Sequence, residues 1–328
     1  MICNSGFLNI QGKNILVTGG AGFIGSTLVR KLLEEKSGVF VLDNFSSGSK
    51  GLLEEVANDI EIIEGNILDE NLAGIFSKHG VDAIFHLAAE PYIPSCYGRP
   101  KDFFETNANG TLNLLLAAKE SGVGRFLYFS SSEVYGSAQK VPMDETHPLN
   151  PLSTYAVSKL AAERLCYTFS NEHELPVIIQ RQFNVFGPRE THPYIIPELI
   201  SQFSKTNTLK LGNTTSSRDF TFVDDAVSAS IMLMKSDKAV GEVFNCAANK
   251  DHTIKEIAEI IAELMGHKKV SIESEKKRFR PLDVQRLIGD YKKINRFTGW
   301  KPMVPFKDGL QKTIDWFNEN SQKWPFKK

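Results

Sequence analysis

The chain has little cysteine and no paired spacing of metal ligands. Its four cysteines, Cys3, Cys96, Cys166 and Cys246, lie far apart among 328 residues, and the seven histidines are equally scattered. Such spacing is typical neither of a disulfide framework nor of a zinc site. We therefore expect a metal-free protein of a reducing compartment.

Long apolar segments and an excess of charge of one sign are also missing. No run of about 18 apolar residues occurs, and residues 1–13 lack the apolar core of a signal peptide. The formal net charge is -1, so no overall field would attract nucleic acid or an anionic membrane. These absences predict a cytoplasmic protein whose partners are neither nucleic acids nor membranes.

The sequence does contain a regular alternation of short β-branched runs and longer helical stretches. Strands are expected over residues 14–18, 39–43, 60–64, 83–87, 126–130 and 177–182, and helices over 22–36, 102–121 and 153–172. This alternation indicates a parallel sheet covered on both faces. After about Asn184, prolines at 188, 193 and 197 interrupt the rhythm.

The sequence thus predicts an α/β fold in two parts. Residues 1–183 would form a Rossmann-type, doubly wound parallel sheet. Residues 184–328 would mostly form a smaller C-terminal substrate-binding lobe. Some segments of this lobe, which has helical patterns over 224–234, 253–264 and 306–319, would return to the main sheet.

A glycine-rich turn follows the first expected strand directly. Gly19, Gly22 and Gly25 form a G-x-x-G-x-x-G arrangement that leads into a helix. Glycine lets the backbone turn tightly and approach a pyrophosphate, and the helix start offers unpaired N–H groups and a positive dipole end. A glycine turn alone is often only a turn, but its place between a strand and a helix indicates a dinucleotide-binding loop.

An acid, Asp43, ends the second expected strand. At this point a carboxylate can hydrogen-bond the adenosine ribose hydroxyls and repel a 2′-phosphate. The predicted cofactor is therefore NAD rather than NADP. The alternative is that Asp43 only begins the turn at residues 44–48.

Tyr155 and Lys159 are spaced to share one face of an expected helix. A phenol titrates near ~10 when unperturbed, and a nearby ammonium and a positive nicotinamide ring both favour the phenolate. Such a pair can act as a general base. This spacing is common on exposed helices, so the context matters. The serine-rich segment 130–133 closes a strand upstream, at the sheet edge where sites of open α/β proteins form.

These motifs occur in order with several others. They are His86-Leu87-Ala88-Ala89, Val134-Tyr135-Gly136, Arg181-x-Phe183-Asn184-Val185-x-Gly187-Pro188-Arg189 and Arg218-Asp219-Phe220. The ordered set runs from Asn14 to about Trp316. It resembles the extended short-chain dehydrogenase/reductases, specifically the nucleotide-sugar epimerases and dehydratases.

The resemblance implies an NAD-dependent enzyme that acts on a nucleotide-diphosphate sugar. Tyr155 would remove the proton of the sugar 4-hydroxyl, Lys159 would hold the nicotinamide ribose, and Ser131 would hydrogen-bond the substrate oxygen. A homodimer built on helices 102–121 and 153–172 is also implied. The implied cofactor contacts are Gly19, Gly22, Phe23, Ile24, Gly25, Asp43, Asn44, Asn66, Ile67, Leu87, Ala88, Ala89, Asn107, Tyr155, Lys159 and Phe183.

The implied substrate contacts are Asn184, Arg189, Arg218, Arg280 and Asp283. Arginine suits a diphosphate because its planar fork donates two parallel hydrogen bonds. Asn66 departs from the family pattern, since many relatives have Asp there. Simpler explanations exist for some residues. Arg189 and Arg218 can pair with Glu190 and Asp219, Asn107 can bond backbone, and His86 is expected to be a packed strand histidine.

Glu133 bears on the reaction. Family members begin with oxidation at C4 of the sugar, and dehydratases resemble this sequence in placing Glu at this position. The dTDP-glucose dehydratases have Asp where Ser132 stands here. The Ser-Glu pair instead resembles GDP-mannose-type dehydratases and UDP-glucuronate decarboxylases. We therefore expect a GDP- or UDP-sugar 4,6-dehydratase.

Alternatives to a dehydratase stay open. They are a 4-epimerase, a UDP-glucuronate-type decarboxylase, a 4-dehydrogenase and a non-catalytic NAD(H)-sensing protein. Glu133 can also be a capping or salt-bridged loop acid. The nucleotide base, the sugar and the stereochemistry are not set by the sequence.

Overall fold

The computed structural model describes residues 8–279, 282 and 284–320. Its centre is a seven-stranded parallel sheet of order β10-β6-β5-β4-β1-β2-β3. The strands are β1 (Asn14–Thr18), β2 (Gly38–Asp43), β3 (Ile60–Glu64), β4 (Ala83–His86), β5 (Arg125–Ser131), β6 (Val177–Gln182) and β10 (Val243–Cys246). This order confirms the predicted Rossmann-type sheet. Its strand order reverses between β1 and β4, the place where such sheets bind ligands.

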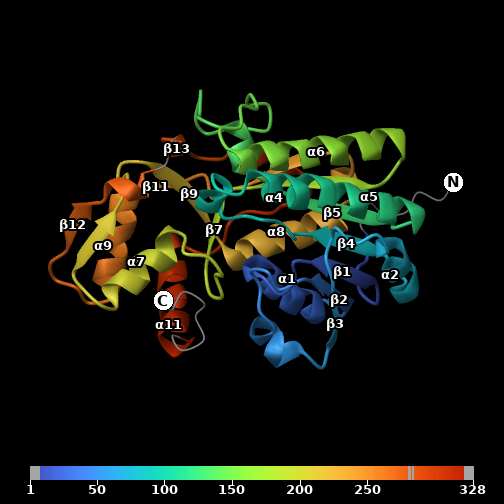
Figure 1. Ribbon diagram of the computed structural model, residues 1–328, viewed down its shortest axis with the longest axis horizontal. Helices are drawn as coiled ribbons and strands as arrows, with labels where there is room; N and C mark the ends of the chain where they lie inside the picture. Colours follow the sequence, from blue (N-terminus) through green and yellow to red (C-terminus); the bar gives the residue numbers. More distant parts are fainter. Residues whose placement is uncertain (1–7, 280–281, 283, 321–328) are drawn as a thin grey trace.

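Helices cover both faces of this sheet (Figure 1). On one face lie α1 (Phe23–Glu34), α8 (Val223–Lys235) and α10 (Lys292–Thr298). On the other lie α2 (Leu72–His79), α4 (Pro100–Phe104), α5 (Gly110–Glu120) and α6 (Thr154–Glu172). Strand β1 serves both cores, because Ile15 and Val17 pack on one face and Leu16 on the other.

The helix expected over residues 102–121 is not continuous. A π-helical turn at Glu105–Asn109 separates α4 from α5. Within this turn, the Asn107 side chain bonds the backbone of Glu90 and the hydroxyl of Ser158. A tertiary contact of this kind, which helical periodicity does not reveal, accompanies the local change of helix type.

The described part of the C-terminal lobe contains two small sheets, which pack with three helices. Strand β9 (Ser217–Phe222) pairs with β7 (Asn184–Phe186), β11 (Asp251–Thr253) and β13 (Arg286–Leu287), while β8 (Thr208–Leu211) pairs with β12 (Ser271–Ser274). The helices are α7 (Ile195–Phe203), α9 (Ile254–Leu264) and α11 (Phe306–Asn320), which share a separate apolar core. Figure 1 shows this lobe beside the main sheet. Elements β10, α8 and α10 also come from residues after 183, and they complete the Rossmann sheet and its covering.

Within the described ranges, no helix is long and apolar enough to cross a membrane. No group of three or more His, Cys, Asp or Glu side chains in those ranges is arranged to hold a metal ion.

Candidate active site

A cavity of about 680 Å³ lies where the carboxyl ends of β1, β4, β5 and β6 meet the C-terminal lobe. Its volume is typical of a small-molecule site. Most of the predicted site residues line it: Gly19, Gly22, Phe23, Ile24, Gly25, Asp43, Asn44, Asn66, Ile67, Leu87, Ala88, Ala89, Ser131, Glu133, Tyr155, Lys159, Phe183, Asn184 and Arg218. Arg280 and Asp283 lie outside the described residues.

The glycine-rich turn after β1 has the geometry that a diphosphate requires. Gly19 has φ +72°, and a Cβ there would lie 2.7 Å from the backbone nitrogen of Ala88. Gly22 caps α1 and provides no side-chain hydrogen bond to the first turn. The first N–H groups of α1 therefore stay available at the positive end of the helix dipole, where they can hold an anion.

Asp43 both braces this turn and lines the cavity. Its carboxylate accepts hydrogen bonds from the backbone N–H of Ala21 (2.9 Å) and of Phe45 (2.8 Å). Burial raises the pKa of Asp43, against these two bonds, which lower it. Each oxygen keeps a second lone pair, so the carboxylate can also accept from a ribose hydroxyl. Asn66 uses its side-chain oxygen locally, accepting from the N–H of Leu68 (3.0 Å).

Tyr155 lies in the first turn of α6, which begins at the N-cap Ser153. Burial raises the pKa of Tyr155 to about 12, while a hydrogen bond with Ser131 lowers it. Ser131 ends β5, so the strand brings its hydroxyl to the phenol. The helical spacing predicts that Lys159 lowers this pKa, but in the structure burial outweighs the hydrogen bond that lowers it.

Lys159 lies one turn further along α6 and is 4% exposed. Its Nζ donates to the carbonyl of Phe129 and lies 4.5 Å from the ring centroid of Tyr128. Burial lowers the pKa of Lys159 to about 7. A carbonyl and an aromatic face therefore hold the amino group at the cavity wall.

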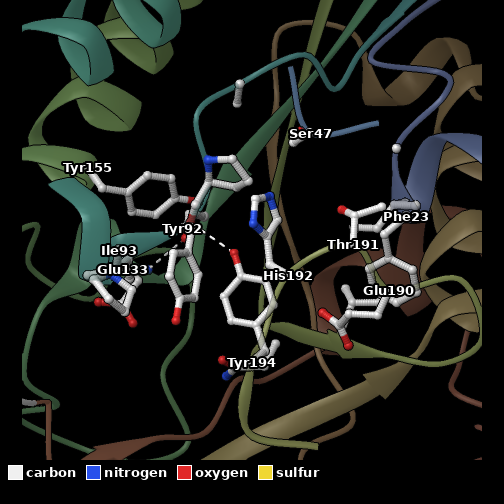
Figure 2. Close-up of a pocket in the computed structure, with 18 of the residues that line it drawn as sticks. Phe23, Ser47, Tyr92, Ile93, Glu133, Tyr155, Glu190, Thr191, His192 and Tyr194 are labelled. Carbon is white, nitrogen blue, oxygen red and sulfur yellow. Dashed lines mark hydrogen bonds between the residues drawn. The ribbon is translucent and has the colours of Figure 1, made fainter. Parts of the chain in front are cut away.

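Glu133 follows β5 in a 3₁₀ turn, Ser132–Tyr135. Its backbone N–H donates to Ser131 Oγ (3.2 Å), but its half-buried carboxylate has no hydrogen-bond or ion-pair partner in the described part of the chain. The salt-bridge alternative therefore finds no support in this geometry. Figure 2 shows Glu133 and Tyr155 on the same side of the cavity. The negative charge of Glu133 also raises the Tyr155 pKa, which is consistent with their proximity.

A buried ion pair holds the segment that carries Ser131 and Glu133. Arg181 on β6 pairs with Glu163 on α6. At one end of the segment, the Ser130 hydroxyl donates to Glu163 Oε2 (2.8 Å). At the other end, the Arg181 guanidinium donates to the hydroxyl of Tyr135 (2.9 Å). The two members of one pair thus anchor the segment at both ends.

Two predicted contact residues, Asn107 and Arg189, do not line the cavity. Asn107 lies behind the wall, where its amide accepts from the N–H of Glu90 (2.8 Å) and donates to Ser158 Oγ (2.9 Å). Arg189 points to α1 and donates to Thr27 Oγ1 (3.0 Å), so it does not pair with Glu190. Asn107 therefore supports the loop after β4, and Arg189 connects the lobe to α1.

The structure confirms His86 as a packed strand residue. It is 1% exposed and lies within hydrogen-bond distance of Thr18 Oγ1 (2.8 Å) and Thr111 Oγ1 (2.9 Å). Asp219, the proposed partner of Arg218, accepts from the backbone N–H groups of Ala248 (2.7 Å) and Asn249 (2.8 Å).

The side chains that line the cavity but were not predicted as site residues include Tyr92, Glu190, His192 and Tyr194. Figure 2 shows three of them as an aromatic cluster between Tyr155 and Glu190. The rings of Tyr92 and His192 stack with centroids 5.4 Å apart, and the Tyr194 hydroxyl donates to the carbonyl of Pro91 (2.9 Å). The proline-rich loop was visible in the sequence, but its contact with the β4 loop was not.

Comparison with known proteins identifies the family of this chain. The family model for GDP-mannose 4,6 dehydratase matches residues 16–313. The chain belongs to the extended short-chain dehydrogenase/reductases, in their nucleotide-sugar epimerase/dehydratase family.

The relatives differ in reaction. The dTDP-glucose 4,6-dehydratase DesIV from Streptomyces venezuelae, solved with NAD bound, is 33% identical with a TM-score of 0.90, covering 95% of this chain and 98% of that chain. The epimerase Mth375 from Methanothermobacter thermautotrophicus is also 33% identical with a TM-score of 0.90, at 96% and 94% coverage. The UDP-glucuronic acid decarboxylase 1 of Xenopus tropicalis is 34% identical, covering 94% of this chain and 72% of the relative. Family membership therefore does not identify the reaction, which depends on the residues of the site.

Proposed function

We propose that this protein is an NAD-dependent nucleotide-sugar 4,6-dehydratase acting on a GDP- or UDP-linked hexose. The observation that carries the proposal is the carboxylate of Glu133, which lies beside Tyr155 at the carboxyl end of β5 and has no partner among the described residues. Two acid–base groups on one side of a single cavity are what oxidation at C4 followed by loss of water requires.

The cofactor part of the proposal rests on the glycine-rich turn, the uncapped start of α1 and Asp43. When bound, NAD⁺ supplies a hydride acceptor for oxidation at C4 and then a hydride donor for C6. Asp43 accepts from the adenosine ribose and disfavours a 2′-phosphate by charge repulsion. We assign residues 1–183 to cofactor binding and residues 184–328 mostly to the nucleotide sugar, with Asn184 and Arg218 lining that part of the cavity.

In the first half of the reaction, Tyr155 takes the proton of the sugar 4-hydroxyl. Ser131 hydrogen-bonds Tyr155, and in this proposal it also bonds the same sugar oxygen. Lys159 presents its ammonium to the nicotinamide ribose and to the developing phenolate. Its positive charge then favours ionised Tyr155, because opposite charges nearby stabilise each other.

In the second half, Glu133 takes the proton from C5, which the C4 ketone makes acidic. Tyr155 and Glu133 then hold one proton each. One of these protons converts the leaving C6 hydroxyl to water as the C5–C6 double bond forms. Return of a hydride to C6 and of the other proton to C5 gives a 4-keto-6-deoxy sugar. The net change is the loss of one water molecule, with no net oxidation.

Incubation of the purified protein with NAD⁺ and a panel of UDP-, GDP-, CDP- and dTDP-sugars tests the proposal by mass spectrometry and NMR. We expect a product lighter by one water, with hydrogen moved from C4 to C6. A product of unchanged mass with inverted C4 would establish a 4-epimerase instead. Loss of CO₂ from a uronic acid would establish a decarboxylase, and stoichiometric NADH with a released keto sugar would establish a dehydrogenase.

We further propose that the protein is a homodimer. Four large apolar side chains are exposed on α4, α5 and α6, which lie along one side of the molecule in Figure 1: Phe104, Leu116, Val157 and Tyr167. Pairing of two copies through these helices would remove this apolar surface from water. Sedimentation of the wild type and of Leu116→Glu tests this, and a monomeric wild type would refute it.

We also propose that the protein is cytoplasmic. Cys96, Cys166 and Cys246 are free and buried, which is compatible with a reducing cytoplasm. Cell fractionation tests the location.

A further inference from the structure

Glu190 is a buried carboxyl group that lines the cavity. It is 3% exposed, and it has no hydrogen bond or ion pair with any described residue. Isolated burial of such a group costs free energy unless a ligand bonds it or it stays neutral. Because Glu190 lines the cavity, a ligand bound there can provide the hydrogen-bond partner that its carboxyl group lacks.

The position of Glu190 indicates which part of a ligand it meets. The adjacent residue, Arg189, reaches Thr27 in the first turns of α1, so this loop lies against the start of that helix. Figure 2 shows Glu190 next to Phe23, the first residue of α1, on the side of the cavity opposite Tyr155 and Glu133. The start of α1 is where N–H groups and the helix dipole favour an anion.

An ionised carboxylate at this place would repel an anion, whereas a neutral carboxylic acid can donate a hydrogen bond to it. Burial raises the pKa of Glu190 well above its ordinary value, and burial is the one cause of this shift. Charged groups on neighbouring elements have other partners: Arg30 on α1 and Asp224 on α8 act on Arg189, and Glu198 on α7 pairs with Arg278. His192 belongs to the same loop as Glu190.

We propose that Glu190 is a binding residue that donates a hydrogen bond, as a neutral acid, to a diphosphate oxygen of a ligand held at the start of α1. This inference rests on the proposed function, which supplies two diphosphates, that of the dinucleotide and that of the nucleotide sugar. In this role Glu190 recognises the charged diphosphate of the ligand and not its sugar.

Two substitutions separate hydrogen bonding from volume. Glu190→Gln keeps a donor and cannot ionise, while Glu190→Met has similar length and no donor. Calorimetric titrations at about pH 6 with NAD⁺, ADP-ribose and a nucleotide sugar measure affinity without turnover. A hydrogen bond to a charged group predicts that Glu190→Met binds about tenfold more weakly than wild type, and that Glu190→Gln binds as wild type does. Glu120→Gln, at an exposed position ending α5, controls for net charge.

The ligands identify the source of the diphosphate. If Glu190→Met binds both NAD⁺ and ADP-ribose more weakly than wild type does, the contact belongs to the dinucleotide. If it binds the nucleotide sugar more weakly, the contact belongs to the substrate. Weaker binding of NAD⁺ but not of ADP-ribose would overturn the diphosphate contact in favour of the nicotinamide. Equal affinity of Glu190→Met and wild type for all ligands would overturn the inference while leaving the proposed function in place.

Repeating the titrations at about pH 9 tests the neutral state. Ionisation would remove the donor, so wild-type affinity relative to Glu190→Gln should fall or stay constant as the pH rises. A relative increase would show an ionised acceptor and overturn the proposal. Failure of the wild type to bind any of the ligands would overturn this inference and the proposed function together.

Discussion

Replacing Lys159 by methionine should stabilise the protein while abolishing its activity. Lys159 is 4% exposed, and burial lowers its pKa from 10.5 to about 7. Because the ammonium binds its proton more weakly in the folded chain than in the unfolded chain, folding is penalised wherever the unfolded lysine is protonated. The penalty is full below about pH 7 and disappears as the pH rises toward 10.5.

The size of this effect follows from the pKa change. One pKa unit corresponds to about 1.4 kcal/mol, so the buried charge costs about 4 kcal/mol at pH 7 and about 2 kcal/mol at pH 9. Methionine also loses the bond to the Phe129 carbonyl and the contact with the Tyr128 ring, which together contribute about 2 kcal/mol. Lys159→Met should therefore be about 2 kcal/mol more stable than wild type at pH 7 and about equal to it at pH 9.

Urea unfolding of the ligand-free proteins at both pH values measures this difference. Lys119→Met, at an exposed position of α5, is the matched control and should show no pH-dependent change. A difference between wild type and Lys159→Met that is the same at pH 7 and pH 9 would refute the argument, because it would show that Lys159 keeps an ordinary proton affinity in the folded state.

Four further substitutions test the site. Tyr155→Phe should retain nucleotide-sugar binding but lose at least about 10²-fold in turnover, and near-normal turnover of a folded variant would contradict its role as base. Asp43→Ala should narrow a preference for NAD⁺ over NADP⁺, and equal wild-type affinities in a titration would count against that role. Glu133→Gln should stop water loss while C4 oxidation stays visible as NADH absorbance; continued water loss would show that another group takes the C5 proton. Arg181→Met leaves Glu163 buried without its partner, so urea unfolding should show a loss of about 3–5 kcal/mol; a loss below about 1 kcal/mol would show that the pair is not needed.

The Rossmann sheet and the dinucleotide turn were predictable because their signals are local. Gly19 is needed for its positive φ of +72°, and Gly25 because a Cβ there would overlap the carbonyl oxygen of Gly19. Helices α1 and α6 begin within one residue of the expected positions. The helix expected over 102–121 shows the limit of this approach. Its π-helical turn accompanies bonds between Asn107 and residues 90 and 158, which lie far away in the sequence.

The far wall of the cavity was not predictable for the same reason. Tyr92 and His192 stack only because the loop after β4 meets the loop after β7. Nothing in the sequence near either residue indicates that contact. Arg189 had a plausible neighbour in Glu190, yet the chain turns between them, with Arg189 at φ +71°. One side chain then faces α1 and the other faces the cavity.

The half-buried Glu133 lines the cavity, whereas the buried Glu163 lies outside its lining, and the two acids differ in function. Glu163 is paired with Arg181 and also accepts from Ser130, so its charge is compensated and its position is fixed. Glu133 must stay unpaired if it is to take a proton, because a bonded carboxylate would be a weaker base. An unpaired acid cannot fix its own position. The pair formed by Glu163 and Arg181 holds both ends of the segment that carries Glu133. The buried ion pair therefore fixes the position of the unpaired acid.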